Sequence, residues 1–114
     1  KIMHRKFGRV RGKRKAFLKT LEHNLIMKEK INTTDARARE LRPLVERLVS
    51  LAKKQNLASF RLLLSRLPKA AASKLYYEIA PRYQNRPGGY LRILKTAKVR
   101  KRDAAKQAII EFVK

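Results

Sequence analysis

Apolar residues recur every three to four positions through most of the first 80 residues, the spacing that buries one face of a helix. The pattern predicts helices at residues 16–29, about 35–54, 57–67 and 69–80. Pro68 and Pro81 are expected to end the last two, because proline cannot continue a regular helix. Pro43 lies inside the second, so that helix must either kink or begin late.

Three shorter segments have strand patterns. The β-branched cluster in "KINTT" (residues 30–34) predicts a short strand, with Thr33 or Thr34 placed to cap the next helix. Alternation in "YLRILKT" (90–96) and "AIIEFV" (108–113) predicts a hairpin. The predicted fold is α+β: helix, strand, three helices and two strands, in two layers with helices covering one face of a small mixed sheet. We expect residues 1–15 to form an extended basic arm and residues 16–114 a single globular domain.

The net charge of the chain restricts the possible classes of partner more than its length does. The 114 residues carry 31 Lys and Arg against 8 Asp and Glu, a net charge of +23. Such a chain repels itself unless an acidic partner covers it, and counterion release on binding phosphates favours nucleic acid over a membrane surface or an acidic polysaccharide. No apolar run approaches the roughly twenty residues that cross a bilayer, so we expect a soluble intracellular protein with no membrane partner.

Neither a metal site nor a cofactor is predicted. The chain has no cysteine, and its two histidines, His4 and His23, lie far apart without paired carboxylates nearby. The Arg-rich, acid-free start could alternatively be a mitochondrial targeting segment. It lacks serine, however, and contains Gly8 and Gly12, which interrupt an amphipathic helix.

The first fifteen residues, "KIMHRKFGRVRGKRK", are rich in Lys and Arg and contain no acid. Their apolar side chains follow no helical or strand period, so the segment alone should be disordered. A merely solvated tail is one reading, and an arm that orders on a phosphate surface is the one we favour. The candidate contacts of this segment and of the helix that follows are His4, Arg5, Lys6, Arg9, Arg11, Lys13, Arg14, Lys15 and Lys19.

Two of the chain's four glycines, Gly88 and Gly89, lie in "NRPGGYLRILK" (residues 85–95). Neither a P-loop nor a dinucleotide fingerprint surrounds them, so phosphate-transfer chemistry is not predicted. The segment is either an ordinary turn with a positive φ or a bend that lets backbone approach a phosphate. Tyr90, like Tyr83, either stacks on an unpaired base or anchors the loop on the core. The predicted contacts here are Arg82, Arg86, Gly88, Gly89, Tyr90, Arg92 and Lys95.

A second basic cluster occupies the tip of the predicted hairpin, at Lys98, Arg100, Lys101 and Arg102. It is either a solvated loop or a phosphate-binding one, and the net charge favours the second. The acids, in contrast, are mostly scattered through helices rich in Lys and Arg, where pairing is their default role. Because hydrolysis and group transfer need a paired acid and base, an activated nucleophile or a metal, we predict no enzymatic activity and no small-molecule substrate.

Several segments together resemble the bacterial-type large-subunit ribosomal protein L17 family over nearly the whole chain. They are "MHRKFGR", "INTTDARARELRPLVERLVSLAK", "RPGGYLRILK" and "AIIEFV". The resemblance implies the same element order, no enzymatic activity, and binding to large-subunit rRNA near the peptide exit side among neighbouring ribosomal proteins. The location would be the ribosome, cytoplasmic or organellar. The family's RNA-facing elements would correspond to the arm, to Arg37 and Arg39, and to the loop from Arg86 to Arg92, and Arg42 completes the predicted contacts.

Alternatives from other classes remain open. The runner-up is a nonspecific nucleoid-type DNA-binding protein, although such proteins usually carry a dimerisation surface and none is obvious here. A cationic membrane-active protein would need a helix with a strongly cationic face and a large apolar one. An enzyme that acts on RNA is the most distant reading.

Overall fold

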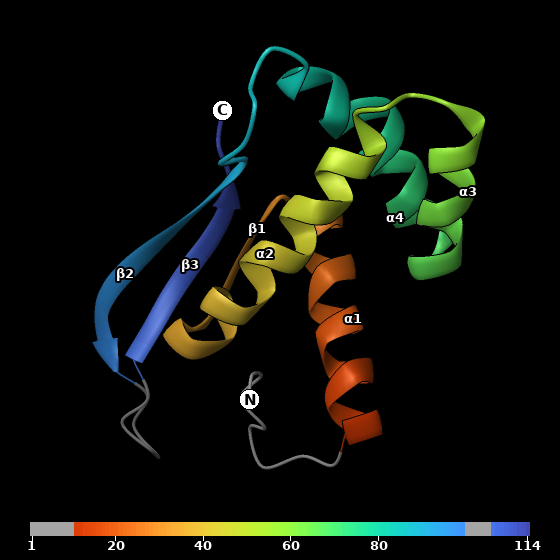
Figure 1. The fold of residues 1–114 in the computed structure, drawn as a ribbon. Helices are drawn as coiled ribbons and strands as arrows, with labels where there is room; N and C mark the ends of the chain where they lie inside the picture. The colour runs from red at the N-terminus through yellow and green to blue at the C-terminus, as the bar shows by residue number, and fades with distance from the viewer. Residues whose placement is uncertain (1–10, 100–105) are drawn as a thin grey trace.

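The computed structural model describes the backbone of residues 11–99 and 106–114 (Figure 1). The elements are α1 (Arg11–Lys28), β1 (Lys30–Thr34), α2 (Asp35–Ala52), α3 (Leu57–Arg66), α4 (Lys69–Lys74), the π-helical turn η1 (Leu75–Ile79), the 3-10 turn η2 (Ala80–Tyr83), β2 (Leu91–Val99) and β3 (Lys106–Phe112). The α+β class and the predicted element order are confirmed. None of the helices in these ranges combines the length and apolar composition that a membrane crossing requires.

The sheet has three strands in the order β1, β3, β2, and both ladders are antiparallel. The expectation of a mixed sheet is therefore wrong. β3 follows β2 directly and pairs with it as a hairpin, which allows only antiparallel pairing, and it separates β2 from β1. Ile31 and Ile93 both lie in register with Ile110 on the central strand. Ala108, Ile110 and Phe112 are buried on one face, as the alternation in "AIIEFV" predicts.

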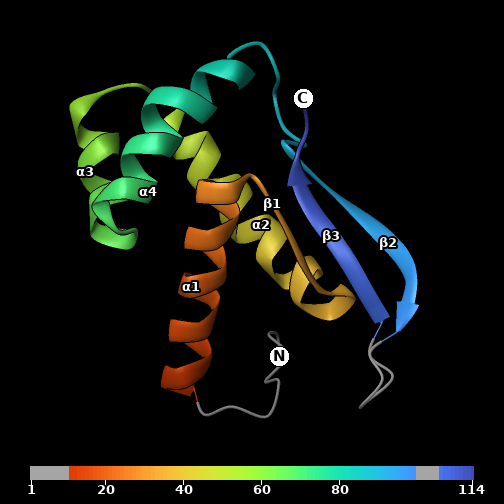
Figure 2. The same cartoon turned by 180° about the vertical axis from the view of Figure 1, so that it is seen from behind.

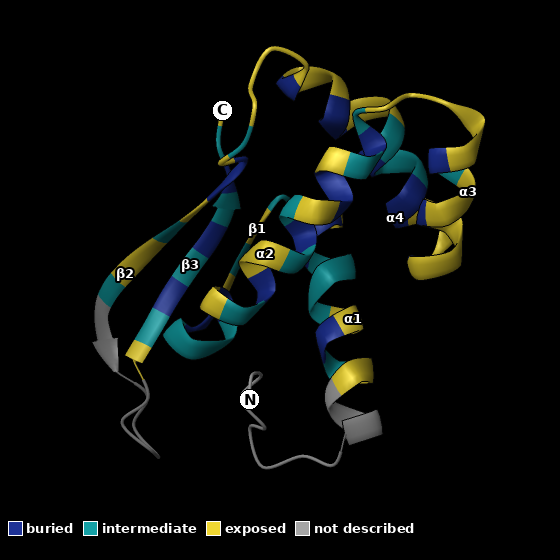
Figure 3. Cartoon of the chain, in the orientation of Figure 1, coloured by how far each residue is buried: buried dark blue, intermediate teal, exposed yellow. Residues whose placement is uncertain are grey.

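The helices lie on one side of the sheet, with α2 against it (Figures 1 and 2). One face of α2 contacts all three strands, and other faces contact α1, α3 and η1. The buried positions of α2 recur at helical spacing and join those of the sheet in one core (Figure 3); they are Ala38, Leu41, Val45, Leu48, Val49 and Ala52. Because strands cover α2 on one side and helices on the other, its solvent-facing stripe runs between the two.

The first helix begins earlier than predicted, at Arg11 instead of Ala16. Lys and Arg are good helix formers, and Gly12 lies in the first turn, where glycine costs less than in a helix interior. The limit of the globular domain at residue 16 stays a prediction.

The second helix begins at Asp35, immediately after a predicted cap. The hydroxyl of Thr34 accepts a hydrogen bond from the backbone N–H of Arg37 at 3.3 Å, and Asp35 places a negative charge in the first turn. The helix contains Pro43. The late start is therefore wrong, because the cap and the buried stripe on both sides of Pro43 offset the one backbone hydrogen bond that proline removes.

The fourth helix is α-helical only as far as Lys74, although the prediction extended it to Ala80. A π-helical turn follows, in which the N–H of Ala80 donates to the carbonyl of Leu75 five residues back. Pro81 does not end the helical segment as expected, because it lies at the start of the 3-10 turn, where its missing N–H needs no partner. The turn carries Tyr83 into the core, where it is 4% exposed.

Candidate nucleic-acid interface

The glycine loop, residues 84–90, joins η2 to β2 and is held by the C-terminal end of α2. Lys53 donates from Nζ to the carbonyl of Arg86 at 2.5 Å and to Tyr90 Oη at 2.9 Å. Gln84 Nε2 donates to the carbonyl of Lys53 at 3.2 Å. One lysine therefore fixes the loop at three points along its length.

Both tyrosines of this region are buried, and Tyr90 is only 2% exposed. The rings of Tyr83 and Tyr90 lie 5.3 Å apart between centroids, and Tyr83 Oη donates to the carbonyl of Val113. Desolvation opposes ionisation of Tyr90, but hydrogen bonds from Lys53 and Ser50 outweigh it and lower the pKa of the phenol. Of the two readings of Tyr90, the geometry supports anchoring on the core, because a buried ring offers no open face to a base.

The two glycines have different conformations. Gly89 has φ of +65°, the left-handed region that favours glycine, so it makes the turn that one of the two readings expects. Gly88 has no such φ, and a Cβ added there would meet nothing within 4 Å. Arg86 folds back over both, with its Nε 3.2 Å from each glycine carbonyl. The other guanidinium donors of Arg86, an exposed residue, make no further hydrogen bond to the described residues.

Acidic side chains hold several of the basic residues. The ion pairs are Arg39 with Asp35 at 3.1 Å, Arg42 with Glu46 at 3.6 Å, Lys74 with Glu29 at 3.2 Å, Arg82 with Glu29 at 2.5 Å, and Arg92 with Glu111 at 2.6 Å. The side chains of Arg39, Arg42 and Arg92 are each about half exposed. A guanidinium has five donors, so a single carboxylate leaves each of them able to bind a phosphate as well.

Arg82 is held more firmly than the other predicted contacts. Its two terminal nitrogens donate to the two oxygens of Glu29 at 2.5 and 3.1 Å, and Lys74 adds a third contact to the same carboxylate. The hydrogen bond from Arg82, which outweighs desolvation, and the contact with Lys74 lower the pKa of Glu29 to about 2. Glu29 itself has φ of 65°, so these contacts stabilise an uncommon backbone conformation at the junction of α1 and β1.

The remaining predicted contacts are distributed over the fold. Arg37 lies with its guanidinium 4.6 Å from the centre of the Phe17 ring, joining α2 to α1. Lys15, Lys19 and Lys95 are exposed. The N-terminal ends of α1 and α2 and the paired ends of β2 and β3 lie toward the same end of the molecule, away from the glycine loop (Figures 1 and 2). Predicted contacts outside the described residues are His4, Arg5, Lys6, Arg9, Arg100, Lys101 and Arg102, and only the backbone is described for Arg11, Lys13, Arg14 and Lys98.

The prediction missed a groove between α2, α3 and the glycine loop, which we call the α2–α3 groove. It has a volume of about 550 Å³, and three basic residues line it: Arg47, Lys54 and Arg66. The sequence carried a signal for it. Positions 43, 46, 47, 50, 51 and 54 share one helical face, opposite the buried stripe of α2, and all of them line the groove.

The described residues offer little for catalysis. No three His, Cys, Asp or Glu side chains gather where they could hold a metal ion within residues 11–99 and 106–114. Burial raises the pKa of Glu22 despite the opposing charges of Lys19 and Arg66. The charges of Lys19 and Arg66 both act on this carboxylate, which fits a role in holding basic side chains at the surface.

These observations define a small, strongly basic α+β protein, and comparison with known proteins gives its family. Residues 17–113 match the family model for ribosomal protein L17. The chain is 46% identical over 114 residues to large ribosomal subunit protein bL17 of Hydrogenobaculum sp., covering 99% of this chain and 97% of the relative. It is 50% identical over 110 residues to the bL17 protein of Sphingopyxis alaskensis, covering 96% and 78%. The chain belongs to the ribosomal protein L17 family, as the resemblance implied.

Proposed function

We propose that the chain is a structural constituent of the large ribosomal subunit that binds and stabilises large-subunit rRNA, and that it has no enzymatic activity. The observation that carries the proposal is the excess of basic side chains over acids. With 31 Lys and Arg against 8 Asp and Glu, most of the basic side chains have no acid to neutralise them. The named relatives are proteins of the large ribosomal subunit, in which rRNA phosphates would supply the missing negative charge.

The proposed RNA surface has two parts. One is the end of the molecule at which α1 and α2 begin, with Arg37 and Arg39 on α2, and to it we add the basic arm and the β2–β3 tip, whose predicted contacts lie mostly outside the described residues. The other is the glycine loop with Arg86 and Arg92. Folded RNA is recognised largely through shape, phosphates and 2′-hydroxyls, and arginine suits phosphates because its planar fork binds them bidentately. Within this surface we assign Arg82 and Tyr90 to positioning the glycine loop.

Neighbouring ribosomal proteins are the second class of partner in the proposal. Large apolar side chains remain exposed on α3 and η1, with Leu57 at 62% and Tyr77 at 65%. These residues lie on the helices with the lowest density of basic residues, so the surface around Leu57 and Tyr77 is better suited to a protein neighbour than to phosphates.

The test is binding of the purified protein to protein-free large-subunit rRNA across a salt series, with excess transfer RNA as competitor. We expect tight binding that survives the competitor and falls steeply with salt, because each phosphate contact releases counterions. A parallel titration with duplex DNA of similar length serves as the control. Binding that the competitor abolishes, or equal affinity for duplex DNA, would overturn the proposal in favour of a general polyanion binder of the nucleoid type.

A further inference from the structure

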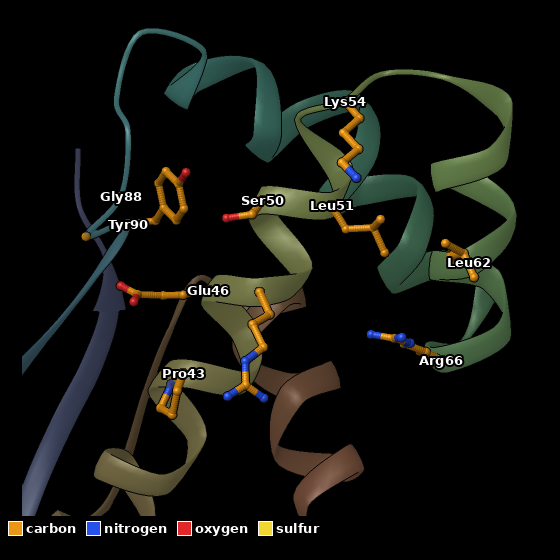
Figure 4. A pocket seen from close by; sticks show the side chains of 11 residues that line it. Pro43, Glu46, Ser50, Leu51, Lys54, Leu62, Arg66, Gly88 and Tyr90 are labelled. Carbon is orange, nitrogen blue, oxygen red and sulfur yellow. The ribbon is translucent and has the colours of Figure 1, made fainter.

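The α2–α3 groove has one helical face as its floor and two walls of different kinds. The floor is the solvent-facing stripe of α2, from Pro43 to Leu51, with Lys54 just beyond the helix end. Figure 4 shows the loop carrying Gly88 on one side of this stripe and α3, with Leu62 and Arg66, on the other. A volume of about 550 Å³ falls within the range of sites that bind small organic groups.

The charge in this groove is unbalanced. Arg47, Lys54 and Arg66 all line it, and none forms an ion pair within 4 Å with the described residues, although the charge of Arg66 acts on the pKa of Glu22 outside the groove. Glu46 is the acid among the lining residues, and its carboxylate already accepts from the N–H of Leu91 at 3.2 Å and pairs with Arg42. In Figure 4 Glu46 extends toward Tyr90, away from Arg66. The lining of the groove therefore carries more positive than negative charge, with Arg47 and Lys54 on the α2 side and Arg66 on α3.

Between the cations the lining is apolar. Leu51 of α2 and Leu62 of α3 lie between Lys54 and Arg66 (Figure 4), and Leu62 is 46% exposed although it is a large aliphatic side chain. An apolar patch formed by Leu51 and Leu62 and flanked by cations fits a nucleotide, whose base is flat and weakly polar on its faces and whose phosphate is anionic. A double helix keeps its base faces stacked, so it could offer its phosphates to these cations but no base face to Leu51 and Leu62.

The glycine wall gives an independent indication. Gly88 lines the groove, its φ is not in the left-handed region, and an added Cβ would meet nothing in the protein. Neither backbone conformation nor internal packing therefore requires glycine at this position, in contrast to Gly89. The missing side chain keeps the wall open to something outside the chain.

We propose that the α2–α3 groove binds an unpaired nucleotide of the rRNA, with the base against Leu51 and Leu62 and the phosphates on Arg47, Lys54 and Arg66. The inference rests on the proposed function and adds to it a specific site for a single-stranded element. This site lies apart from the end of the molecule at which α1 and α2 begin. It uses cations that the charge clusters of the sequence do not single out.

The experiment compares two variants that lose the same charge. The double variant R47Q/R66Q removes two groove cations, whereas R61Q/K69Q removes two exposed cations that do not line the groove. Both are titrated with protein-free large-subunit rRNA under transfer RNA competition, and the rRNA in each complex is probed with base-reactive reagents. We expect R47Q/R66Q to bind at least about tenfold more weakly than R61Q/K69Q, and to lose protection of an unpaired base that the unaltered protein and the control both protect.

A second variant, Gly88→Val, tests the wall without changing charge. It should unfold at close to the same denaturant concentration as the unaltered protein, because a Cβ at this position meets nothing within 4 Å, yet lose the same base protection. Equal affinity and equal protection for R47Q/R66Q and R61Q/K69Q, with rRNA binding intact, would overturn the groove assignment alone. Failure of the unaltered protein to bind rRNA under competition would overturn the proposed function and the groove with it.

Discussion

The glycine loop and the α2–α3 groove share residues 88–90, yet their cations differ in how far they contact oxygens of the chain itself. On the loop side, Lys53, Arg82 and Arg92 are tied to carbonyl, hydroxyl or carboxylate oxygens of the chain. On the groove side, Arg47 and Arg66 have no ion pair among the described residues. The loop is therefore held in place by its basic side chains, whereas the basic side chains of the groove are left without an ion pair. A basic residue that already contacts an acid or a carbonyl of the chain has fewer donors left for a partner than an unpaired one.

The largest effect should come from breaking the scaffold at Tyr90. We expect Tyr90→Ala to destabilise the fold by about 3 kcal/mol, because it removes a buried aromatic ring and the oxygen that Lys53 contacts. Urea denaturation measures the change. Tyr77→Ala is the matched control, since that ring is 65% exposed and its loss should cost under about 1 kcal/mol. Equal losses for the two variants would show that the loop is not anchored through Tyr90.

The next effect concerns the acid that holds Arg82. Glu29→Gln keeps the shape of the side chain but removes the charge that Arg82 and Lys74 share, and we expect a loss of about 1 to 2 kcal/mol after allowing for solvent screening of these partly exposed groups. Glu78→Gln removes the same charge from an exposed residue that forms no ion pair with the described residues. It should change stability by less than about 0.5 kcal/mol.

The same pair sets a pH dependence. The pKa of Glu29 falls from 4.5 to about 2 on folding, so its contribution to stability is complete above pH 4.5 and is lost as the pH falls toward 2. Urea midpoints of the unaltered protein should fall across that window more steeply than those of Glu29→Gln, which has no proton to take up there. Parallel pH profiles for the two proteins would refute this role of Glu29.

Much of the fold was predictable because its signals are local. Thr34 and Asp35 mark the start of α2 within two residues of sequence, and the alternation in β3 identifies its buried face. The direction of β1 against β3 was not predictable, because these two strands are distant in sequence and no hairpin joins them, whereas the hairpin fixes the antiparallel pairing of β2 with β3. The π-helical turn was equally hidden. It is defined by a hydrogen bond between Ala80 and Leu75 that no propensity scale records.

The candidate site divides in the same way. The sequence identified the Arg-rich clusters, but it could not show that Arg82 meets a carboxylate 53 positions away, which gives a predicted phosphate contact a partner within the chain. The apolar run in α3 indicated packing, and Leu63 is indeed buried. Leu62 and Leu64 are not. Which leucines face outward depends on how α3 lies on α2, and the groove arises from that packing.

Arg86 and Arg92 are the exposed cations at the glycine loop, and removing both tests whether they also bind RNA. We expect R86Q/R92Q to weaken rRNA binding by about tenfold and to make the slope of log affinity against log salt shallower by about two, because two phosphate contacts are lost. R61Q/K69Q is the control for loss of net charge. An unchanged slope would mean that these arginines serve only the loop, where Arg86 covers the glycine carbonyls and Arg92 pairs with Glu111.

The smallest effect separates a paired cation from an unpaired one on the same helix. Arg39 pairs with Asp35 one turn earlier, whereas Arg47 has no ion pair among the described residues. Arg39→Gln should cost about 0.3 to 0.5 kcal/mol of stability, and Arg47→Gln should cost nothing measurable. In rRNA binding we expect the opposite order. Arg47→Gln should weaken the affinity roughly threefold more than Arg39→Gln, because a phosphate near Arg39 competes with a carboxylate and one near Arg47 does not. Equal affinities would mean that pairing within the chain does not decide which cations reach RNA.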